Sequence, residues 1–511
     1  MKIDTTHQTQ ARARKIPLPA LPVWTKTVLH MAGIGIVWSL LAFFAFIDGL
    51  ALGWIALAAA VMGKGPNLDG LGFGLISIAL TIALTFLAGR LAGSMRRAGL
   101  FTATVIGFVL VGFAIWAPLH PQRAVFLARA IAWGPSEVRD YLKFPDRPIT
   151  NGAPNFQFKQ ASEPWTPPII EYTSEGEARR LGLEEMLDAT NTTSFIVIKD
   201  DVILYEGYFN GYRRDSIVTS FSMAKSFTSA LVGIAIGEGH IGGVNDLVID
   251  YLPELKGRGL DNLTIRHLLN MSSGIRYFAD DEVPFLVEMF QFTDDGLSYS
   301  YPDLRSQALN LQPGKPAVGA EFNYNNYHLQ LLGLILERTT SMPPAEYLQE
   351  KIWKLLGMEY PGSWSLDSEE TSFEIMTAGI NARAIDFARF GRLFLNKGNW
   401  EGRQVVPEAW VVESTAPDPD DDRPWHSAAE WKNAGGYYKY LWWGVHRPDG
   451  TYDFVARGHL GQRIYVAPAY GMVIVRFGFD EGGVDSWEYV MMDIIADVTH
   501  TESRAPHDGA D

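Results

Sequence analysis

The sequence predicts an α+β domain preceded by an all-α transmembrane segment of about three helices. Three observations lead to this fold class: long apolar runs fill much of the first 120 of 511 residues, a proline-rich stretch follows, and β-rich runs stand at both ends of the remainder with helical patterns between them. The chain has no cysteine, which excludes a disulfide scaffold, a Cys-based zinc finger and a cysteine nucleophile.

The membrane prediction rests on three runs without a formal charge, residues 27–47, 71–89 and 99–117. Each has about the 20 residues that a helix needs to cross the hydrocarbon core of a bilayer. Residues 49–63 are apolar but short, and Asp48 separates them from the first run, so we expect an interfacial or re-entrant segment there. A fourth span at 49–63 is the alternative. The first run starts too late and lacks the cleavage pattern of a signal peptide.

Basic residues set the predicted topology. Arg12, Arg14, Lys15 and Lys26 precede the first span, and Arg96 and Arg97 lie between the second and third. The positive-inside rule places both clusters in the cytoplasm. We therefore expect a multi-pass protein of the plasma (inner) membrane, with the lipid bilayer as a partner and everything after residue 118 on the periplasmic or extracytoplasmic side.

The sign of the net charge changes near residue 120, where the predicted membrane segment ends. The whole sequence has a formal net charge of −15, yet residues 1–120 hold nine Lys and Arg against three acids. The later part is thus strongly acidic. Phosphate binding needs clustered basic side chains, so we expect no nucleic-acid partner.

The predicted domains are a cytoplasmic tail (1–26), transmembrane helices (27–118), a proline-rich linker (119–168), a globular domain (169–500) and a C-terminal tail (501–511). Within the globular domain, residues 194–209 predict a hairpin and residues 463–479 predict two strands. Helical patterns occupy residues 222–239, 263–271, 326–341 and 384–398. Strands at both ends indicate that the termini of this domain meet in one antiparallel sheet.

Ser222 and Lys225 form an S-x-x-K pattern at the start of the helix 222–239. Residues three apart share a helix face, so the hydroxyl and the amine can approach hydrogen-bond distance. Unpaired N–H groups at the helix N-terminus favour a developing oxyanion. Burial in so apolar a helix would lower the pKa of the lysine and make it a general base near neutral pH. The structural alternative is an N-cap serine and a solvated lysine.

With these residues the sequence resembles the serine β-lactamase-like superfamily of penicillin-recognising enzymes, whose first motif is S-x-x-K. It is most similar to the class C branch and its 6-aminohexanoate-dimer hydrolase-like relatives, in which the second motif is Y-x-N, here Tyr324-Asn325-Asn326. Similar phrases, among them LTIRHLLNMSSGI, extend over about residues 190–498. The resemblance implies a β-lactamase/transpeptidase-like domain, with an antiparallel sheet flanked by helices and a helical subdomain.

The resemblance also implies roles for particular residues. Ser222 is the nucleophile that forms an acyl-enzyme, Lys225 and Tyr324 act as general base and acid, and Asn326 orients the substrate. A neighbouring ammonium would lower the pKa of Tyr324 and allow it to act as a phenolate or a proton relay. Apart from the resemblance, we expect the aromatic side chain of Tyr277 to line an apolar cleft, and core packing is the alternative.

The third motif departs from the family pattern K-T-G, because residues 456–462 read ARGHLGQ. In one register Gly458 matches the family glycine, and the backbone N–H groups of Ser222 and His459 form the oxyanion hole. In the other register His459-Leu460-Gly461 matches an H-x-G variant, and the hole uses Ser222 and Gln462. Both registers lack the lysine that helps to bind a β-lactam carboxylate.

The sequence therefore predicts a membrane-anchored serine hydrolase that cleaves an amide or ester in a small or peptide-like substrate, without a metal or a cofactor. One alternative is a β-lactamase or D,D-peptidase acting on penicillins or peptidoglycan, which the missing lysine disfavours. Another is a membrane penicillin-binding sensor without turnover, which the lack of an H-E-x-x-H motif in the front segment disfavours.

Overall fold

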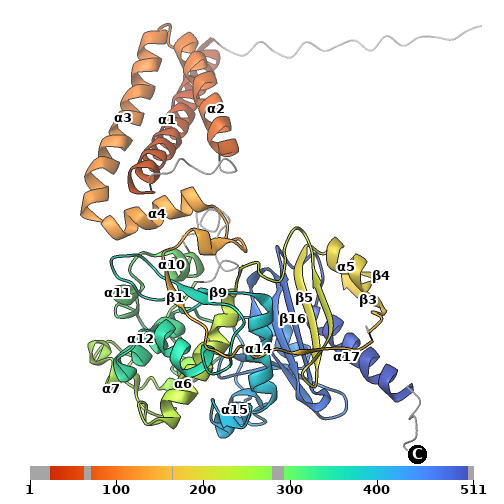
Figure 1. Cartoon of the computed structure of the whole chain (residues 1–511). Coiled ribbons are helices and arrows are strands. Elements are labelled where there is room, and N and C mark those ends of the chain that lie inside the picture. Colours follow the sequence, from red (N-terminus) through yellow and green to blue (C-terminus); the bar gives the residue numbers. More distant parts are fainter. Residues whose placement is uncertain (1–22, 63–70, 164, 279–292, 505–511) are drawn as a thin grey trace, which may run out of the picture. The chain divides into compact units, whose positions relative to one another are not determined.

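The computed structural model describes residues 23–62, 71–163, 165–278 and 293–504. The chain forms two compact units, Met1–Ala124 and Val125–Asp511. Both are drawn in Figure 1, and each is described by itself below.

The first unit consists of three apolar helices, α1 (Val23–Met62), α2 (Leu71–Leu91) and α3 (Met95–Leu119). The helices pack through small and apolar side chains around Leu41, Ala88 and Ala98. Other large apolar side chains point outward, and Phe108 is 80% exposed. Outward-facing apolar side chains suit a lipid environment better than water.

Two segments of this unit, Met31–Gly53 and Met95–Leu119, are long and apolar enough to cross a membrane. They suggest that the protein is anchored in a membrane. The predicted second span coincides with α2. The side chains of this helix are described only for residues 78–91, and this apolar stretch is shorter than a membrane span. The basic residues Arg12, Arg14 and Lys15 lie outside the described residues.

The prediction for residues 49–63 was wrong in one respect. Residues 49–62 are not a separate segment, because α1 continues through Asp48 without a break. Asp48 is 4% exposed and is thus enclosed within the helical unit. Gly49 explains the close packing at this point, since a Cβ there would come within 2.9 Å of Val109 Cβ. A helix of 40 residues is about 60 Å long, which exceeds one hydrocarbon core.

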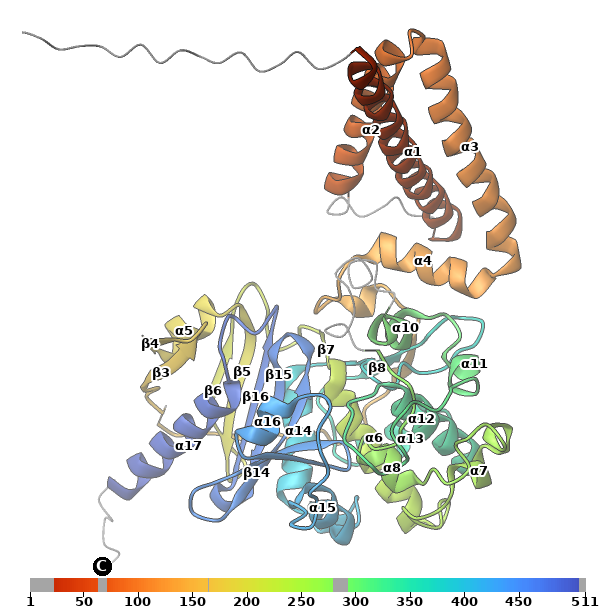
Figure 2. The ribbon, with the colours of Figure 1, turned by 180° about the vertical axis from the view of Figure 1, so that it is seen from behind.

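The second unit is an α+β fold, as predicted, and its elements are numbered in Figures 1 and 2. The helices are α4 (Pro121–Trp133, which begins in the first unit), α5 (Leu183–Ala189), α6 (Ala224–Gly237), α7 (Val248–Tyr251), α8 (Ile265–Leu269), α10 (Asp294–Ser300), α11 (Leu304–Ala308), α12 (Tyr327–Thr340), α13 (Pro344–Leu348), α14 (Ala384–Leu395), α15 (Glu408–Thr415), α16 (Ala429–Asn433) and α17 (Trp487–Arg504). The strands are β1 (Asp146–Ile149), β2 (Lys159–Gln160), β3 (Ile169–Ser174), β4 (Glu177–Gly182), β5 (Thr192–Lys199), β6 (Val202–Tyr208), β7 (Val218–Thr219), β8 (Gly362–Ser365), β9 (Ile380–Ala382), β10 (Asn399–Trp400), β11 (Arg403–Gln404), β12 (Gly436–Lys439), β13 (Trp442–His446), β14 (Tyr452–Gly458), β15 (Gln462–Ala467) and β16 (Met472–Gly478).

An eight-stranded sheet with the order β12-β13-β14-β15-β16-β5-β6-β2 forms the centre of this unit. The late strand β16 pairs with the early strand β5, which confirms that the two ends of the domain meet in one sheet. Successive residues of β15 face opposite sides, as strand geometry requires. Ile464 packs against α14, whereas Arg463 bonds to Glu488 of α17, so the two helices cover opposite faces of the sheet.

The helices between β7 and β8, α6 among them, gather to one side of the strands of the central sheet, as Figure 2 shows. The segment predicted as a linker contributes two short strands to the unit. β1 pairs with β8, and β2 pairs in parallel with β6. These strands are too short to show a strand pattern in the sequence, and β1 also contains Pro148.

Candidate active site

The S-x-x-K residues lie on a tight turn that leads into a buried helix. Ser222 is the middle residue of a 3-10 turn, Phe221–Met223, and α6 follows at once. Phe221 has a φ of +45°, a conformation that costs energy for a non-glycine residue. The backbone before the serine is therefore held in an unusual shape by its surroundings, as is common at functional sites.

Lys225 points back to the serine from the first turn of α6. Its Nζ lies 2.7 Å from Ser222 Oγ and 3.2 Å from the carbonyl oxygen of Thr377. The lysine side chain is 1% exposed. Burial lowers the pKa of the Lys225 amine to about 7, and the nearby Asp295 carboxylate opposes this shift. A lysine with such a pKa is present partly as the neutral amine at neutral pH, as general-base catalysis requires.

Residues 377–380, which lead into β9 and include its first residue, fix the turn. The backbone N–H of Ser220 donates to the carbonyl of Ile380 at 2.8 Å, and the Ser220 hydroxyl donates to the carbonyl of Ala378 at 3.2 Å. Together with the Thr377 carbonyl, these contacts join the nucleophile turn and the lysine to one stretch of chain. Sequence reasoning did not identify this stretch, because its contribution is made by backbone atoms.

Tyr324 lies beside this pair, immediately before α12. Its ring centroid is 4.9 Å from Lys225 Nζ, and its hydroxyl lies close enough to Ser222 for that side chain to act on the pKa of Tyr324. Burial raises the pKa of Tyr324 above its ordinary value, and the Ser222 contact and the Arg457 charge oppose this rise in part. The structure thus gives Tyr324 a protonated hydroxyl at rest, which suits a proton relay better than the phenolate alternative.

Asn326 and Tyr277 converge on a carboxylate that the sequence did not single out. Asn326 donates from Nδ2 to Asp295 Oδ1 at 2.9 Å, and the Tyr277 hydroxyl donates to the same oxygen. Tyr277 is 6% exposed, so it lies beneath the site and not along an open cleft wall. The pKa of Tyr277 is raised, chiefly by burial and next by Asp295. Asp295 stands in the first turn of α10, where a Thr-Asp-Asp sequence signals a helix start but no chemistry.

The third-motif region approaches the nucleophile turn from the sheet. β14 ends at Gly458, and a Cβ at this position would lie 2.4 Å from the carbonyl oxygen of Ser220. Only glycine allows this approach. His459 follows directly, is exposed, and its ring lies 5.5 Å from the ring of Phe221.

Gly461 and Gln462 occupy the next turn and the start of β15. Gly461 has a φ of +78°, and Gln462 pairs with Gly458 across the β14–β15 ladder. The Gln462 side chain is buried and exchanges hydrogen bonds with the backbone of Gly478, at 2.8 and 3.0 Å. These contacts give Gln462 a structural part in the sheet.

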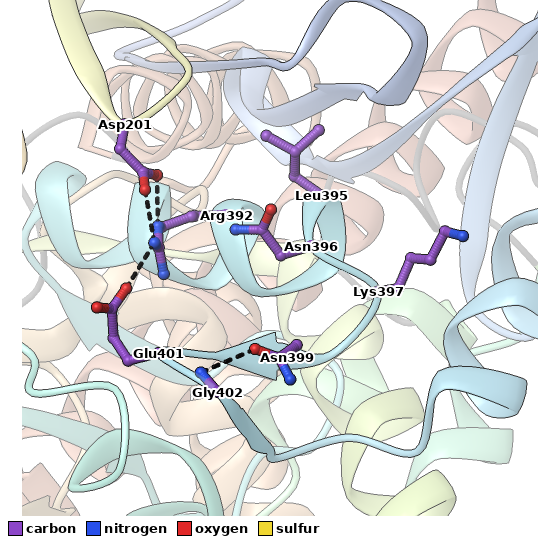
Figure 3. A pocket seen from close by; sticks show the side chains of 8 residues that line it. All are labelled: Asp201, Arg392, Leu395, Asn396, Lys397, Asn399, Glu401 and Gly402. Atoms are coloured by element: carbon purple, nitrogen blue, oxygen red, sulfur yellow. Dashed lines mark hydrogen bonds and ion pairs between the residues drawn. The ribbon is translucent and has the colours of Figure 1, made fainter.

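A surface pocket elsewhere on the unit has a different character (Figure 3). It lies beside the C-terminal end of α14 and the β10–β11 hairpin. Arg392 donates to the carboxylates of Asp201 and Glu401, and its guanidinium lies 4.3 Å from the Trp400 ring centroid. With Lys397, which also lines the pocket, two cations face two carboxylates, so the pocket has the features of a structural ion-pair cluster.

Comparison with known proteins supports the fold and the kind of chemistry. The sequence profile of the beta-lactamase family matches residues 183–482, more than half of the chain, and the protein belongs to this family. The chain is therefore a serine hydrolase with a β-lactamase fold.

Among individual proteins, the chain is 27% identical over 347 residues to the 6-aminohexanoate-dimer hydrolase of Paenarthrobacter ureafaciens, covering 66% of this chain and 86% of that one. A solved structure from Bacillus anthracis, inferred to be a 6-aminohexanoate-dimer hydrolase, has a TM-score of 0.59 and 25% identity, covering 71% of this chain and 92% of that chain. A protein of Salmonella agona inferred to be a D-alanyl-D-alanine carboxypeptidase is 26% identical over 189 residues, covering 33% of this chain and 42% of its own length.

Proposed function

We propose that this protein is a membrane-anchored serine hydrolase that cleaves a small amide or ester through an acyl-enzyme at Ser222. The observation that carries the proposal is the 2.7 Å contact between Ser222 Oγ and a buried lysine amine whose pKa is about 7. The names of the relatives support an amide or peptide-like substrate.

The proposed reaction begins when neutral Lys225 takes the proton of Ser222 as Oγ attacks the substrate carbonyl carbon. The C=O double bond opens to a tetrahedral oxyanion, which the backbone N–H groups of Ser222 and His459 stabilise. The close approach of Gly458 to Ser220 supports this register of the third motif over the one that uses Gln462.

Collapse of the oxyanion restores the carbonyl and breaks the bond to the leaving group. We assign the proton on the leaving nitrogen or oxygen to Tyr324, which regains one from the Lys225 ammonium. A water molecule then attacks the Ser222 ester by the reverse proton path and releases the acid. Asn326, held by Asp295, would orient the substrate beside this path.

The membrane part of the proposal is a multi-pass anchor in the plasma (inner) membrane, with the hydrolase unit on the periplasmic or extracytoplasmic side. Two helices of sufficient length and apolarity support the anchor. The exposed basic pair Arg96 and Arg97, in the first turn of α3, supports a cytoplasmic position for the connection between α2 and α3.

Labelling with a fluorophosphonate probe tests the nucleophile. We expect Ser222→Ala to abolish both labelling and hydrolysis of a short-chain ester. Ser229→Ala is a matched control on the same helix, because Ser229 is buried and its hydroxyl has no hydrogen-bond partner among the described residues. If Ser222→Ala retained turnover, Ser222 would not be the nucleophile. A labelled penicillin that acylates Ser222 for hours without release would favour the sensor instead.

A further inference from the structure

The last residue before the third-motif glycine is an arginine whose side chain is held in a fixed place. The Arg457 guanidinium carbon lies 4.4 Å from the ring centroid of Trp431 and 5.1 Å from that of Trp443. Its Nε lies 2.9 Å from Glu488 Oε1. Two aromatic faces and one carboxylate therefore restrict the position of this cation.

The carboxylate does not neutralise Arg457 alone. Glu488 is 3% exposed and also accepts from Arg463, at 2.7 Å between Arg463 Nε and the same oxygen. Two guanidinium groups thus share one buried carboxylate oxygen. Burial lowers the pKa of Arg457 and Glu488 opposes that shift. Arg463 also lies 3.3 Å from Glu481, so the cluster holds two guanidinium groups and two carboxylates, and Glu488 is the carboxylate that contacts Arg457.

Trp443 connects this cation to the proton-transfer residue. Its ring centroid lies 5.1 Å from the Arg457 guanidinium carbon and 5.5 Å from the ring centroid of Tyr324. Arg457 is also among the charges that lower the pKa of Tyr324. The cation and the phenol therefore share Trp443 as a neighbour.

The other groups around Tyr324 cannot supply a constant positive charge. Lys225 from α6 titrates near neutral pH, Asp295 from α10 is an acid that raises the pKa of Tyr324, and Tyr438 from β12 is a buried phenol. Among the described groups that act on Tyr324, Arg457 is the permanent cation. A phenol that gives up its proton in a buried site needs such a charge nearby.

We propose that Arg457 is a positioning residue that stabilises negative charge on the Tyr324 oxygen while Tyr324 passes its proton to the leaving group. This rests on the proposed acyl-enzyme mechanism. The proton travels from Ser222 to Lys225, from Lys225 to Tyr324 and from Tyr324 to the departing atom, so the phenol bears charge only transiently. Arg457 does not touch the reacting atoms and acts through Tyr324.

The test compares two substrates that share one acyl group. The nitrophenolate of a p-nitrophenyl ester leaves without a proton, whereas the amine of the corresponding alkyl amide must receive one. We expect Arg457→Gln to reduce kcat on the amide by about 10- to 100-fold and to change acylation by the p-nitrophenyl ester by less than about threefold. Arg457→Lys, which keeps the charge, should recover part of the amide activity.

Two further variants separate this role from a structural one. Arg457→Met keeps the apolar stem between the tryptophans, and the folded fraction is measured by fluorophosphonate labelling. Arg447→Gln is the matched control, because Arg447 lies 4.5 Å from the Tyr470 ring and bonds to Asp453, outside the site. In the double variant with Tyr324→Phe, removal of Arg457 should cause no additional loss on the amide.

Equal losses on the two substrates, or additive losses in the double variant, would overturn the role of Arg457. Either result leaves the nucleophile assignment intact if Ser222→Ala remains inactive. Failure of the proposed function is distinct, because it would appear as activity in Ser222→Ala itself.

Discussion

The Lys225 amine nitrogen lies 2.7 Å from the Ser222 hydroxyl oxygen, and the lysine side chain is almost entirely excluded from water. Exclusion of water is what separates this lysine from an ordinary one, because a buried ammonium loses its hydration and gives up its proton more readily. The helix that produces the S-x-x-K spacing also lowers the pKa of its lysine.

The rate of acylation should therefore depend on pH through Lys225. Its pKa is about 7 in the fold, and only the neutral amine can take the serine proton. The acylation rate of the p-nitrophenyl ester should fall tenfold per pH unit below about pH 6 and level off above about pH 8. Lys225→Met should lower this rate by about 100- to 10,000-fold and abolish the fall in rate at low pH, which is the acidic limb of the pH–rate profile. A wild-type rate that is flat between pH 5 and 8 would contradict the assignment of the base.

Asp295 should affect the pH at which the acylation rate begins to fall. Its carboxylate raises the pKa of Lys225, against the effect of burial. Asp295→Asn removes the charge and keeps an oxygen that can accept from Asn326, so the pKa of Lys225 should fall below 7 and the acidic limb should move to lower pH. The measurement is the pH profile of p-nitrophenyl ester acylation in both proteins. Movement of the limb to higher pH would show that Asp295 does not act on Lys225 in this way.

Gly458 gives a steric test of the third motif. The Cβ introduced by Gly458→Ala would lie 2.4 Å from the Ser220 carbonyl oxygen, so either the strand end or the nucleophile turn must move. We expect a loss in kcat/KM of at least about tenfold and a destabilisation of about 1 to 3 kcal/mol. Gly243→Ala is the control, because a Cβ there meets nothing within 4 Å. Unchanged activity in Gly458→Ala would mean that this strand end does not shape the site.

The parts of the fold that the sequence predicts are those with local signals. The hairpin predicted for residues 194–209 appears as β5 and β6, and the helix predicted for 326–341 appears as α12. By contrast, β1 gains its strand geometry from β8, more than 200 residues later. Such a long-range pairing cannot be predicted from the local sequence.

The contacts of the candidate site also differ in whether local sequence predicts them. Ser222 and Lys225 are close in sequence, so helix spacing alone predicts their contact. Asp295 reaches Asn326 from a separate helix, and Arg457 is placed by two tryptophans on other elements. Both are ordinary charged residues in the sequence, and only the tertiary fold gives them a relationship to the nucleophile.

The membrane topology can be tested with single cysteines, because the natural chain contains none and a thiol-reactive probe has no background. We expect a membrane-impermeant maleimide to label Glu369→Cys, an exposed position of the hydrolase unit, in intact spheroplasts. Arg97→Cys, exposed at the start of α3, should react only after the membrane is permeabilised. The physical reason is the cost of moving the basic pair Arg96 and Arg97 across the bilayer, which keeps it in the cytoplasm. If the two cysteines react in the opposite order, the hydrolase unit lies in the cytoplasm; if both react in intact spheroplasts, α3 does not cross the membrane as proposed.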